Sequence, residues 1–349
     1  MTGVLIALAA LLVFVVLIQI ARTSELVSFI KGEENTERNS RFQGAMLMVF
    51  MVVGLVATVW SVFYFQDRFL PESASEHGSL IDSMFNTTLL FTGIVFFITQ
   101  ILLFYFSWKY AERKGRKAYY YPENNKLELA WTIVPAIVLT FLVVQGLTSW
   151  YSITGDAPEE RIEFEATGKQ FAWIIRYPGM DGELGELAPK SEVSPTNEVG
   201  INWEDPRAKD DFIANDIVIP VNTPVRVNIN ALDVLHSFFL PHFRVKMDAV
   251  PGTPTSFWFT PTITTAEMRE RTDNPDFDYE LACAEICGRG HSSMRKIVKV
   301  VPMEEYEAWV AEQTPYSELV GAYENPESEE STTAQVVEND NQTTQTAEL

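Results

Sequence analysis

Long apolar segments and short alternating ones divide the chain into two unlike halves. Four stretches of the first half contain no charged residue, and short charged connections separate them: 1–21, 42–66, 83–108 and 129–155. A helix needs roughly 20 apolar residues, with a rise of about 1.5 Å each, to cross a bilayer. Buried helices of a soluble core rarely run so long without a charge, so the pattern predicts four membrane-spanning helices.

The first stretch has a second interpretation, a secretory signal that is removed. It lacks a basic n-region, and its apolar run from Val4 to Ile20 is longer than usual, so we predict that it is retained. The connections 22–41 and 109–128 carry four and six Lys or Arg, against one in 67–82. Positive charge favours the cytoplasmic side. Both termini and the chain beyond residue 155 are therefore expected on the extracytoplasmic side.

From Arg161 onward the pattern changes to short β-rich runs between Gly and Pro turns. We expect strands in seven ranges: 162–166, 171–177, 216–220, 225–230, 256–260, 280–282 and 296–301. Strands of this length and spacing favour a sandwich or barrel. Residues 303–313 predict one short helix, and 178–209, rich in Gly, Pro and acidic residues, predict a surface loop or insertion.

The predicted fold class is a membrane-anchored α region followed by an all-β head. We expect a two-helix membrane region (1–82), a transmembrane hairpin (83–155), a head with its insertion (156–323) and an acidic disordered tail (324–349). The net charge of −21 falls entirely in 152–349. Such an acidic chain argues against nucleic-acid binding, and two cysteines exclude a disulfide scaffold and a four-cysteine zinc site.

The two cysteines belong to a compact cluster of soft ligands, Cys283-x-Glu285-x-Cys287-x3-His291-x2-Met294. Thiolate, imidazole and thioether together select copper, and magnesium or calcium would not choose them. A blue-copper site uses one cysteine, so the second permits two sulfurs to bridge two copper ions. Each ion then needs one histidine and one weak ligand, and the second histidine is either His236 or His242. A disulfide is the alternative, but it explains neither His291 nor Met294.

Three segments together resemble subunit II of the haem–copper cytochrome c oxidases: 233–237, 246–252 and the Cys283–Met294 cluster. Residues 124–135 also resemble the start of that family's second transmembrane helix. The resemblance implies a cupredoxin-like head with a binuclear copper A centre of two copper ions. It implies that His236 and His291 bind through imidazole and that the sulfurs of Cys283 and Cys287 bridge the ions. It also implies that Met294 is a weak thioether ligand and that Glu285 binds through its main-chain carbonyl.

The resemblance assigns roles to further residues. The Glu285 side chain faces a magnesium shared with subunit I, whose oxygen preference suits a carboxylate. Glu128 corresponds to a glutamate at a proton-channel entrance, or it simply caps a helix N-terminus. Phe171 stands where the family normally has the tryptophan through which electrons enter, and Trp173 lies nearby. Both rings have the alternative of merely packing the sandwich.

The function implied is that of a bacterial inner-membrane subunit that accepts electrons from a cytochrome c and passes them to the haem of subunit I. Oxygen reduction coupled to proton translocation then occurs in subunit I. The acidic head would steer a basic cytochrome, or its charge is only a solvated surface. The chain has no CxxCH and carries no c-type haem. Family members usually have two helices before the head, so the helices predicted at 1–21 and 42–66 are extra. We interpret them as a lipid-embedded docking surface, for instance for a quinol-oxidising complex within a supercomplex.

Two other functions compete with this one. A quinol-oxidase relative shares the fold but lacks the copper ligands, all of which are present here. A membrane-tethered copper-binding or copper-delivery module would need only one span, whereas the pattern predicts four.

Overall fold

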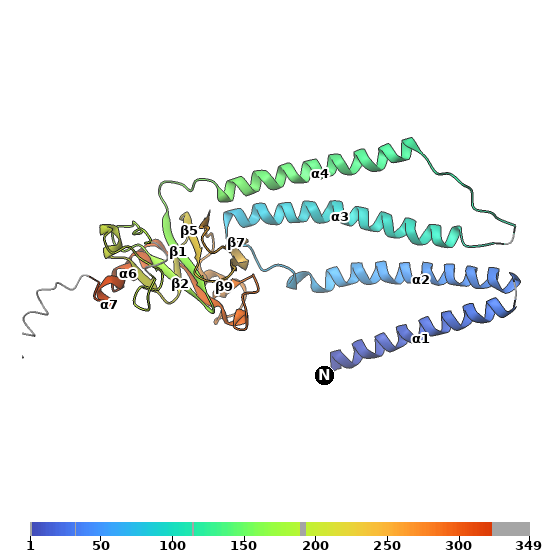
Figure 1. Ribbon diagram of the computed structural model, residues 1–349, viewed down its shortest axis with the longest axis horizontal. Coiled ribbons are helices and arrows are strands. Elements are labelled where there is room, and N and C mark those ends of the chain that lie inside the picture. Colours follow the sequence, from blue (N-terminus) through green and yellow to red (C-terminus); the bar gives the residue numbers. More distant parts are fainter. Residues whose placement is uncertain (1, 32, 114, 189–192, 323–349) are drawn as a thin grey trace, which may run out of the picture. The chain divides into compact units, whose positions relative to one another are not determined.

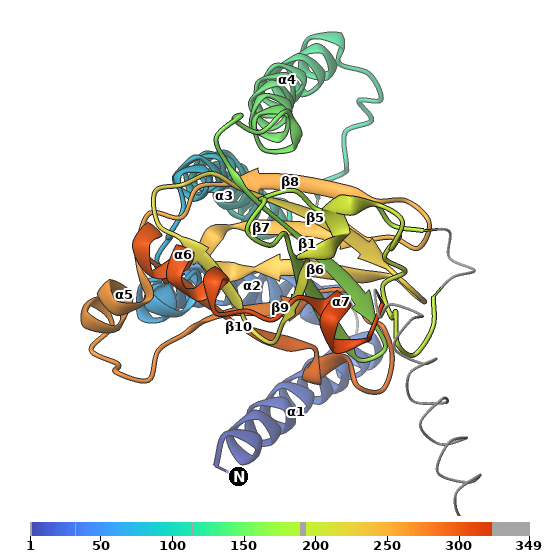
Figure 2. The ribbon, with the colours of Figure 1, turned by 90° about the vertical axis from the view of Figure 1, so that its left-hand side faces the viewer.

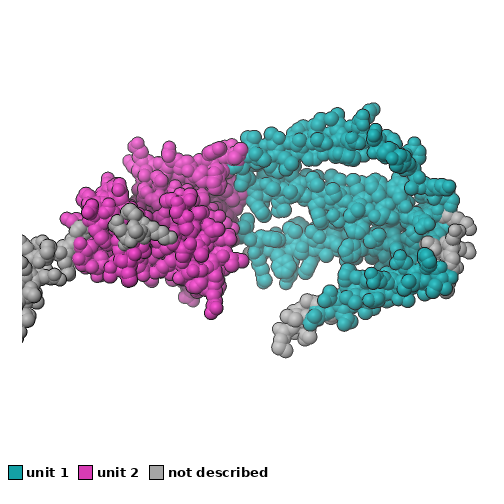
Figure 3. All heavy atoms as spheres, viewed as in Figure 1, with its two compact units in different colours: residues 1–70, 83–146 teal, residues 71–82, 147–349 magenta. Residues whose placement is uncertain are grey.

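The structure, a computed structural model, describes residues 2–31, 33–113, 115–188 and 193–322. The chain forms two compact units, the first comprising 1–70 with 83–146 and the second 71–82 with 147–349 (Figure 3). The acidic tail predicted at 324–349 lies outside the described residues.

Four long helices account for the first half of the chain (Figure 1). They are α1 (Thr2–Lys31), α2 (Glu33–Phe65), α3 (Glu76–Lys109) and α4 (Asn125–Thr154). Each is long and apolar enough to cross a membrane, and its apolar side chains are exposed, which confirms the four predicted helices. The helices extend beyond the charge-free stretches because the polar flanks remain helical. Phe50 packs on Phe104, and Phe91 on Phe141, with ring centroids 5.8 and 6.1 Å apart.

The head contains two five-stranded sheets (Figure 2). One has the order β3-β2-β1-β5-β8 and the other β4-β10-β9-β6-β7. The pairs β1–β5 and β4–β10 are parallel and the other pairs antiparallel. The strands are β1 (Ile162–Lys169), β2 (Ala172–Tyr177), β3 (Phe212–Ala214), β4 (Ile217–Pro220), β5 (Val225–Ala231), β6 (His236–Leu240), β7 (Val245–Ala249), β8 (Thr255–Phe259), β9 (Tyr279–Cys283) and β10 (Arg295–Val301). The predicted cupredoxin-like class is confirmed.

The head also contains short helices and 3-10 turns. They are the helices α5 (Thr265–Arg271), α6 (Met303–Ala311) and α7 (Tyr316–Leu319), with the 3-10 turns η3 (Pro206–Lys209), η4 (Pro241–Phe243) and η5 (His291–Ser293). The turn η1 (Gln66–Arg68) follows α2. The Trp309 ring of α6 packs edge-on against Tyr177 and Phe212, which fixes this helix on the sandwich.

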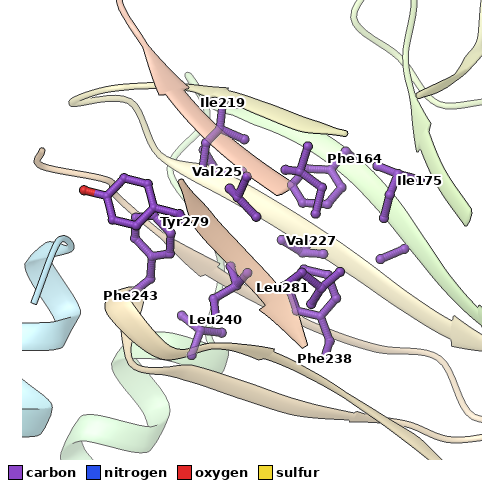
Figure 4. Close-up of a cluster of buried hydrophobic side chains, with 14 of the residues drawn as sticks. Phe164, Ile175, Ile219, Val225, Val227, Phe238, Leu240, Phe243, Tyr279 and Leu281 are labelled. Carbon is purple, nitrogen blue, oxygen red and sulfur yellow. The ribbon is translucent and has the colours of Figure 1, made fainter. Parts of the chain in front are cut away.

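The hydrophobic core lies between the sheets and takes side chains from both (Figure 4). Phe164 and Val227 come from the first sheet and Phe238 and Leu281 from the second, and all four are fully buried. Burying one such side chain contributes roughly 1.5–3 kcal/mol. This core supports β6 and β9, the two strands that carry candidate metal ligands.

The predicted insertion at 178–209 encloses a second, smaller core. Val199, Ile201 and Ala208 are buried with Ile174 of β2. Beside them, Arg176 is buried between two carboxylates, 3.0 Å from Glu165 and 2.6 Å from Asp211. Arg176 also donates to the Gly185 carbonyl at 2.9 Å. The described part of the insertion is thus tied to the sheet.

The connection between α2 and α3 is packed on the head. Residues 71–82 belong to the second unit, and Ala74 is fully buried. The Ala74 N–H donates to the His242 carbonyl at 2.8 Å, and the Ser75 hydroxyl donates to the Phe243 carbonyl at 2.7 Å. Arg244 pairs with Asp82 at 2.6 Å. This connection, which we call the strap, completes the head from a distant part of the sequence.

Candidate metal centre

Two neighbouring strands bring the candidate ligands together. Cys283 ends β9, and Cys287, η5 and Met294 follow in the loop that leads to β10. β6 pairs antiparallel with β9, and Phe238 lies opposite Cys283 in the register. His236, two residues earlier on β6, therefore lies beside this loop although it is 47 positions away in the sequence.

The donor atoms form two similar halves. In one half, Cys283 Sγ lies 4.0 Å from His236 Nδ1 and 3.2 Å from the Glu285 carbonyl oxygen. In the other, Cys287 Sγ lies 3.7 Å from His291 Nδ1 and 3.3 Å from Met294 Sδ. Each sulfur thus has one imidazole nitrogen and one weak donor beside it.

The chemistry of these donors fits copper. The ligand atoms of His236, Cys283 and Cys287 all lie within 4.8 Å of one another. The two cysteines are free thiols, so the disulfide alternative does not describe this structure. Burial raises the pKa of the Cys287 thiol to about 11, and the neighbouring Cys283 adds to the shift. Thiols bind metals as thiolates, so binding must release protons.

Asp233 holds the His236 ring in place. His236 is fully buried, and its Nε2 lies 2.9 Å from Asp233 Oδ1. Burial acts to raise the pKa of Asp233, but hydrogen bonds from His236 and from the N–H groups of Gln170 and Val234 outweigh it, and the pKa is lowered. When Nε2 carries the proton and donates a hydrogen bond to this carboxylate, the Nδ1 lone pair is free to bind a metal.

Glycines let the surrounding segments approach closely. A Cβ at Gly168 of β1 would lie 2.9 Å from His236 Cδ2 and 3.0 Å from its Cγ. A Cβ at Gly290 would lie 2.5 Å from the Phe171 ring. The ring of Phe171 therefore lies directly on the loop of the candidate ligands.

The two aromatic candidates occupy different environments. Trp173 is only 2 % exposed and meets His236 edge-on, with ring centroids 6.0 Å apart. Phe171 is 38 % exposed on the surface of the head. One ring thus adjoins a candidate ligand from inside the core, and the other presents its surface to solvent.

His242 and the Glu285 side chain do not belong to the cluster of donor atoms, although the Glu285 carbonyl does. The His242 ring packs between Phe277 and Tyr279, with both centroid distances 5.2 Å, and burial, together with Arg244, lowers its pKa. Among the described residues, no group of three His, Cys, Asp or Glu side chains gathers around the exposed Glu285.

Glu128 lies in the first turn of α4, where its carboxylate accepts the Asn124 N–H at 3.3 Å. Asn124 in turn accepts the Leu127 N–H at 3.0 Å. These contacts are those of a helix cap.

Sequence reasoning had not assigned any role to Gly168, Gln170 or Asp233. Asp233 precedes His236 by three residues, a spacing that allows contact, but only the fold shows that its carboxylate reaches Nε2. For Gly168 and Gln170 no local signal exists, because their partners lie on strands far along the chain.

Comparison with known proteins identifies the family of this chain. The family model for the periplasmic domain of cytochrome c oxidase subunit II matches residues 162–301, and the model for its transmembrane domain matches 57–148. The chain belongs to the cytochrome c oxidase subunit II family. It is thus a membrane protein with a periplasmic domain and part of an oxidoreductase complex, as predicted. The family implies a copper A site. α1 and most of α2 precede the matched residues.

Individual relatives agree with this assignment. The alternative cytochrome c oxidase subunit 2 of Bradyrhizobium diazoefficiens is 35% identical over 243 residues, which cover 69% of this chain and 83% of that protein. Subunit 2 of Cereibacter sphaeroides is 31% identical over 230 residues, 63% of this chain and 71% of that protein. The crystal structure of the periplasmic domain of subunit II (CoxB) of Bradyrhizobium japonicum has 30% sequence identity and a TM-score of 0.30, and the match covers 44% of this chain and 94% of that one.

Proposed function

We propose that the cluster is a copper A centre that receives electrons from a cytochrome c and delivers them to the haem of subunit I. His236 and His291 would hold copper through Nδ1 and Cys283 and Cys287 through their sulfurs, and Met294 and the Glu285 carbonyl would complete the set. The observation that carries this proposal is the paired arrangement, in which each sulfur has its own imidazole and its own weak donor.

Copper held by these residues would supply one-electron transfer. The protein's contribution is a rigid and largely dry frame. His236, Cys287 and Met294 are 0%, 5% and 1% exposed, and burial around the sulfurs tunes the potential. We assign the role of receiving electrons from the donor to Phe171, because its ring is exposed and contacts the loop. Trp173, whose ring meets His236 and Phe238 edge-on, is the second candidate for this role.

Apolar side chains beside the centre suit protein partners. Ile286, in the loop, is 84% exposed and Leu235 is 49% exposed. Contiguous exposed apolar surface marks interaction sites, and we assign these two side chains to the surface that meets subunit I and the cytochrome. The negative charge of the second half would speed encounter with a basic donor. A quinol-oxidising complex that carries its own cytochrome c would meet the same surface, and we keep the extra helices as its docking region.

Three further assignments belong to the same proposal. The Glu285 side chain offers an oxygen ligand for a magnesium completed by subunit I. Glu128 serves as the proton-channel entrance, although its contacts in this chain are those of a cap. The Lys and Arg distribution supports a periplasmic location for the head and both termini.

The test is to purify the complex through this full-length chain and to measure its copper content, near-infrared absorption and EPR signal. Two copper ions per chain with a mixed-valence signal, together with a haem-containing subunit I, are the expected result. Complex without copper would indicate a quinol-oxidase relative. Copper without subunit I would indicate a delivery module.

A matched pair of variants makes this test specific. Met294→Leu is expected to change the copper spectrum, because it removes a donor at 3.3 Å from Cys287 Sγ. Met268→Leu, at a fully buried methionine of α5, keeps volume in the same way and should leave the spectrum unchanged. Equal spectra in both variants would refute the assignment of Met294.

A further inference from the structure

Gln170, in the turn between β1 and β2, touches both halves of the candidate centre. Its side-chain Nε2 donates to the main-chain carbonyl of Cys287 at 2.6 Å. Its backbone N–H donates to Asp233 Oδ2 at 2.7 Å, and the other oxygen of this carboxylate holds His236. A single residue therefore connects the segment that bears one bridging sulfur with the support of one imidazole.

The fold leaves room for this contact and for nothing larger. A Cβ at Gly288 would lie 3.0 Å from Gln170 Nε2, so the amide rests directly on the backbone that follows Cys287. Phe171, the next residue, lies on Gly288 and Gly290 in the same way. The side chains of the β1–β2 turn thus pack on the backbone of the ligand loop, and this packing limits the movement of Cys287.

We propose that Gln170 is a positioning residue for the copper centre: it fixes the Cys287 peptide and Asp233 in one frame and thereby sets the potential and the hold on the metal. This inference rests on the proposed function. The amide donor on the Cys287 carbonyl places positive partial charge beside the peptide of a proposed ligand, which favours the electron-rich reduced state. Removing the donor should lower the reduction potential. It should also loosen the loop, because groups that orient ligands typically affect metal affinity by 10- to 100-fold.

The experiment compares Gln170→Glu and Gln170→Leu with the wild type in the full-length chain. Gln170→Glu keeps the shape of the side chain but replaces the donor with an acceptor, and Gln170→Leu removes both. Copper loss to a chelator, followed by the near-infrared band, should be roughly 10-fold faster in both variants. The midpoint potential, measured by redox titration of the same band, should fall in both and fall further in Gln170→Glu, because a carboxylate adds negative charge.

Gln313→Leu is the matched control. Gln313, which follows α6, also donates its side-chain amide to a main-chain carbonyl, that of Trp309 on α6 at 2.9 Å. This variant should keep the wild-type potential and copper-loss rate. Equal changes in the Gln313 and Gln170 variants would assign the effect to general loosening of the head and overturn the proposal, as would wild-type values in both Gln170 variants.

Different results would refute the proposed function and the positioning role of Gln170. A wild-type chain that takes up copper without a mixed-valence band would refute the proposed function. A normal wild-type band with unchanged Gln170 variants would refute only the positioning role.

Discussion

Gly168→Ala tests whether the close contact between β1 and His236 positions the metal ligand. The added Cβ would lie 2.9 Å from Cδ2 and 3.0 Å from Cγ of the imidazole, whereas ordinary contact begins at 3.4 Å. The ring would have to retreat by about 0.5 Å. Metal–ligand distances tolerate only about 0.2 Å, so the displacement exceeds what a copper site accepts.

The ring has little freedom to absorb this shift. It is fully buried, and its Nε2 is held by Asp233 at 2.9 Å. Trp173 meets it edge-on. We expect Gly168→Ala to destabilise the head by about 1–3 kcal/mol, the usual cost of overpacking, and to change the copper signal even in the folded fraction.

The assay is copper content, near-infrared absorption and EPR of the full-length chain, with thermal unfolding measured in parallel. Gly93→Ala on α3 is the control, because a Cβ there has no neighbour within 4 Å, and it should leave the copper signal unchanged. A Gly168→Ala chain with the wild-type spectrum and full copper content would refute the reasoning.

Three other substitutions test separate parts of the structure. Arg176→Met should destabilise the head by about 3–5 kcal/mol, because it leaves Glu165 and Asp211 buried without their cation. Burial already raises the pKa of Asp211 to about 6, against the opposing pull of Arg176. Asp211 therefore binds more protons in the folded than in the unfolded state between about pH 4 and 6, so the part of the stability that depends on Asp211 falls as pH rises through that window. Losing the cation should steepen this fall, and denaturant unfolding at pH 5 and pH 8 measures it; an equal loss at both pH values would contradict the argument. Asp233→Asn should weaken copper binding by about 10-fold or more by removing the charged partner of His236, as measured by competition with a chelator, and wild-type affinity would show that the contact is dispensable. Phe171→Ala should slow reduction by cytochrome c in stopped-flow experiments while leaving the copper spectrum in place; an unchanged rate would exclude Phe171 as the receiving ring.

Most of the helices and strands that could be predicted follow from patterns among residues close in sequence. Four charge-free stretches sufficed for the helices. β5 was predictable because its buried and partly exposed residues alternate along Val225–Ala231. β6 was missed because four of its five residues are buried, so no alternation marks it. β3 and β7 were also missed, the first being three residues long and the second containing two exposed charged or polar positions.

In the metal centre, too, only the ligands that lie close together in the sequence were predictable. The ligands from Cys283 to Met294 fall within one loop and were visible as a motif. The choice between His236 and His242 was not available from spacing, because it depends on the register of β6 against β9. That register places His236 at the loop, whereas His242 lies in η4 against Phe277 and Tyr279. Contacts such as those of Gln170 and Asp233 depend on the same tertiary arrangement.

The strap has a consequence for how the head is made. Ser75 reaches a partner 168 positions later in the chain, and synthesis at about 5–20 residues per second separates the two by roughly ten to thirty seconds. During that interval α3 and α4 are synthesised and the strap has no surface to bind. The earliest piece of the head thus gains its contacts only after segments made much later, so the head does not assemble in the order of the sequence.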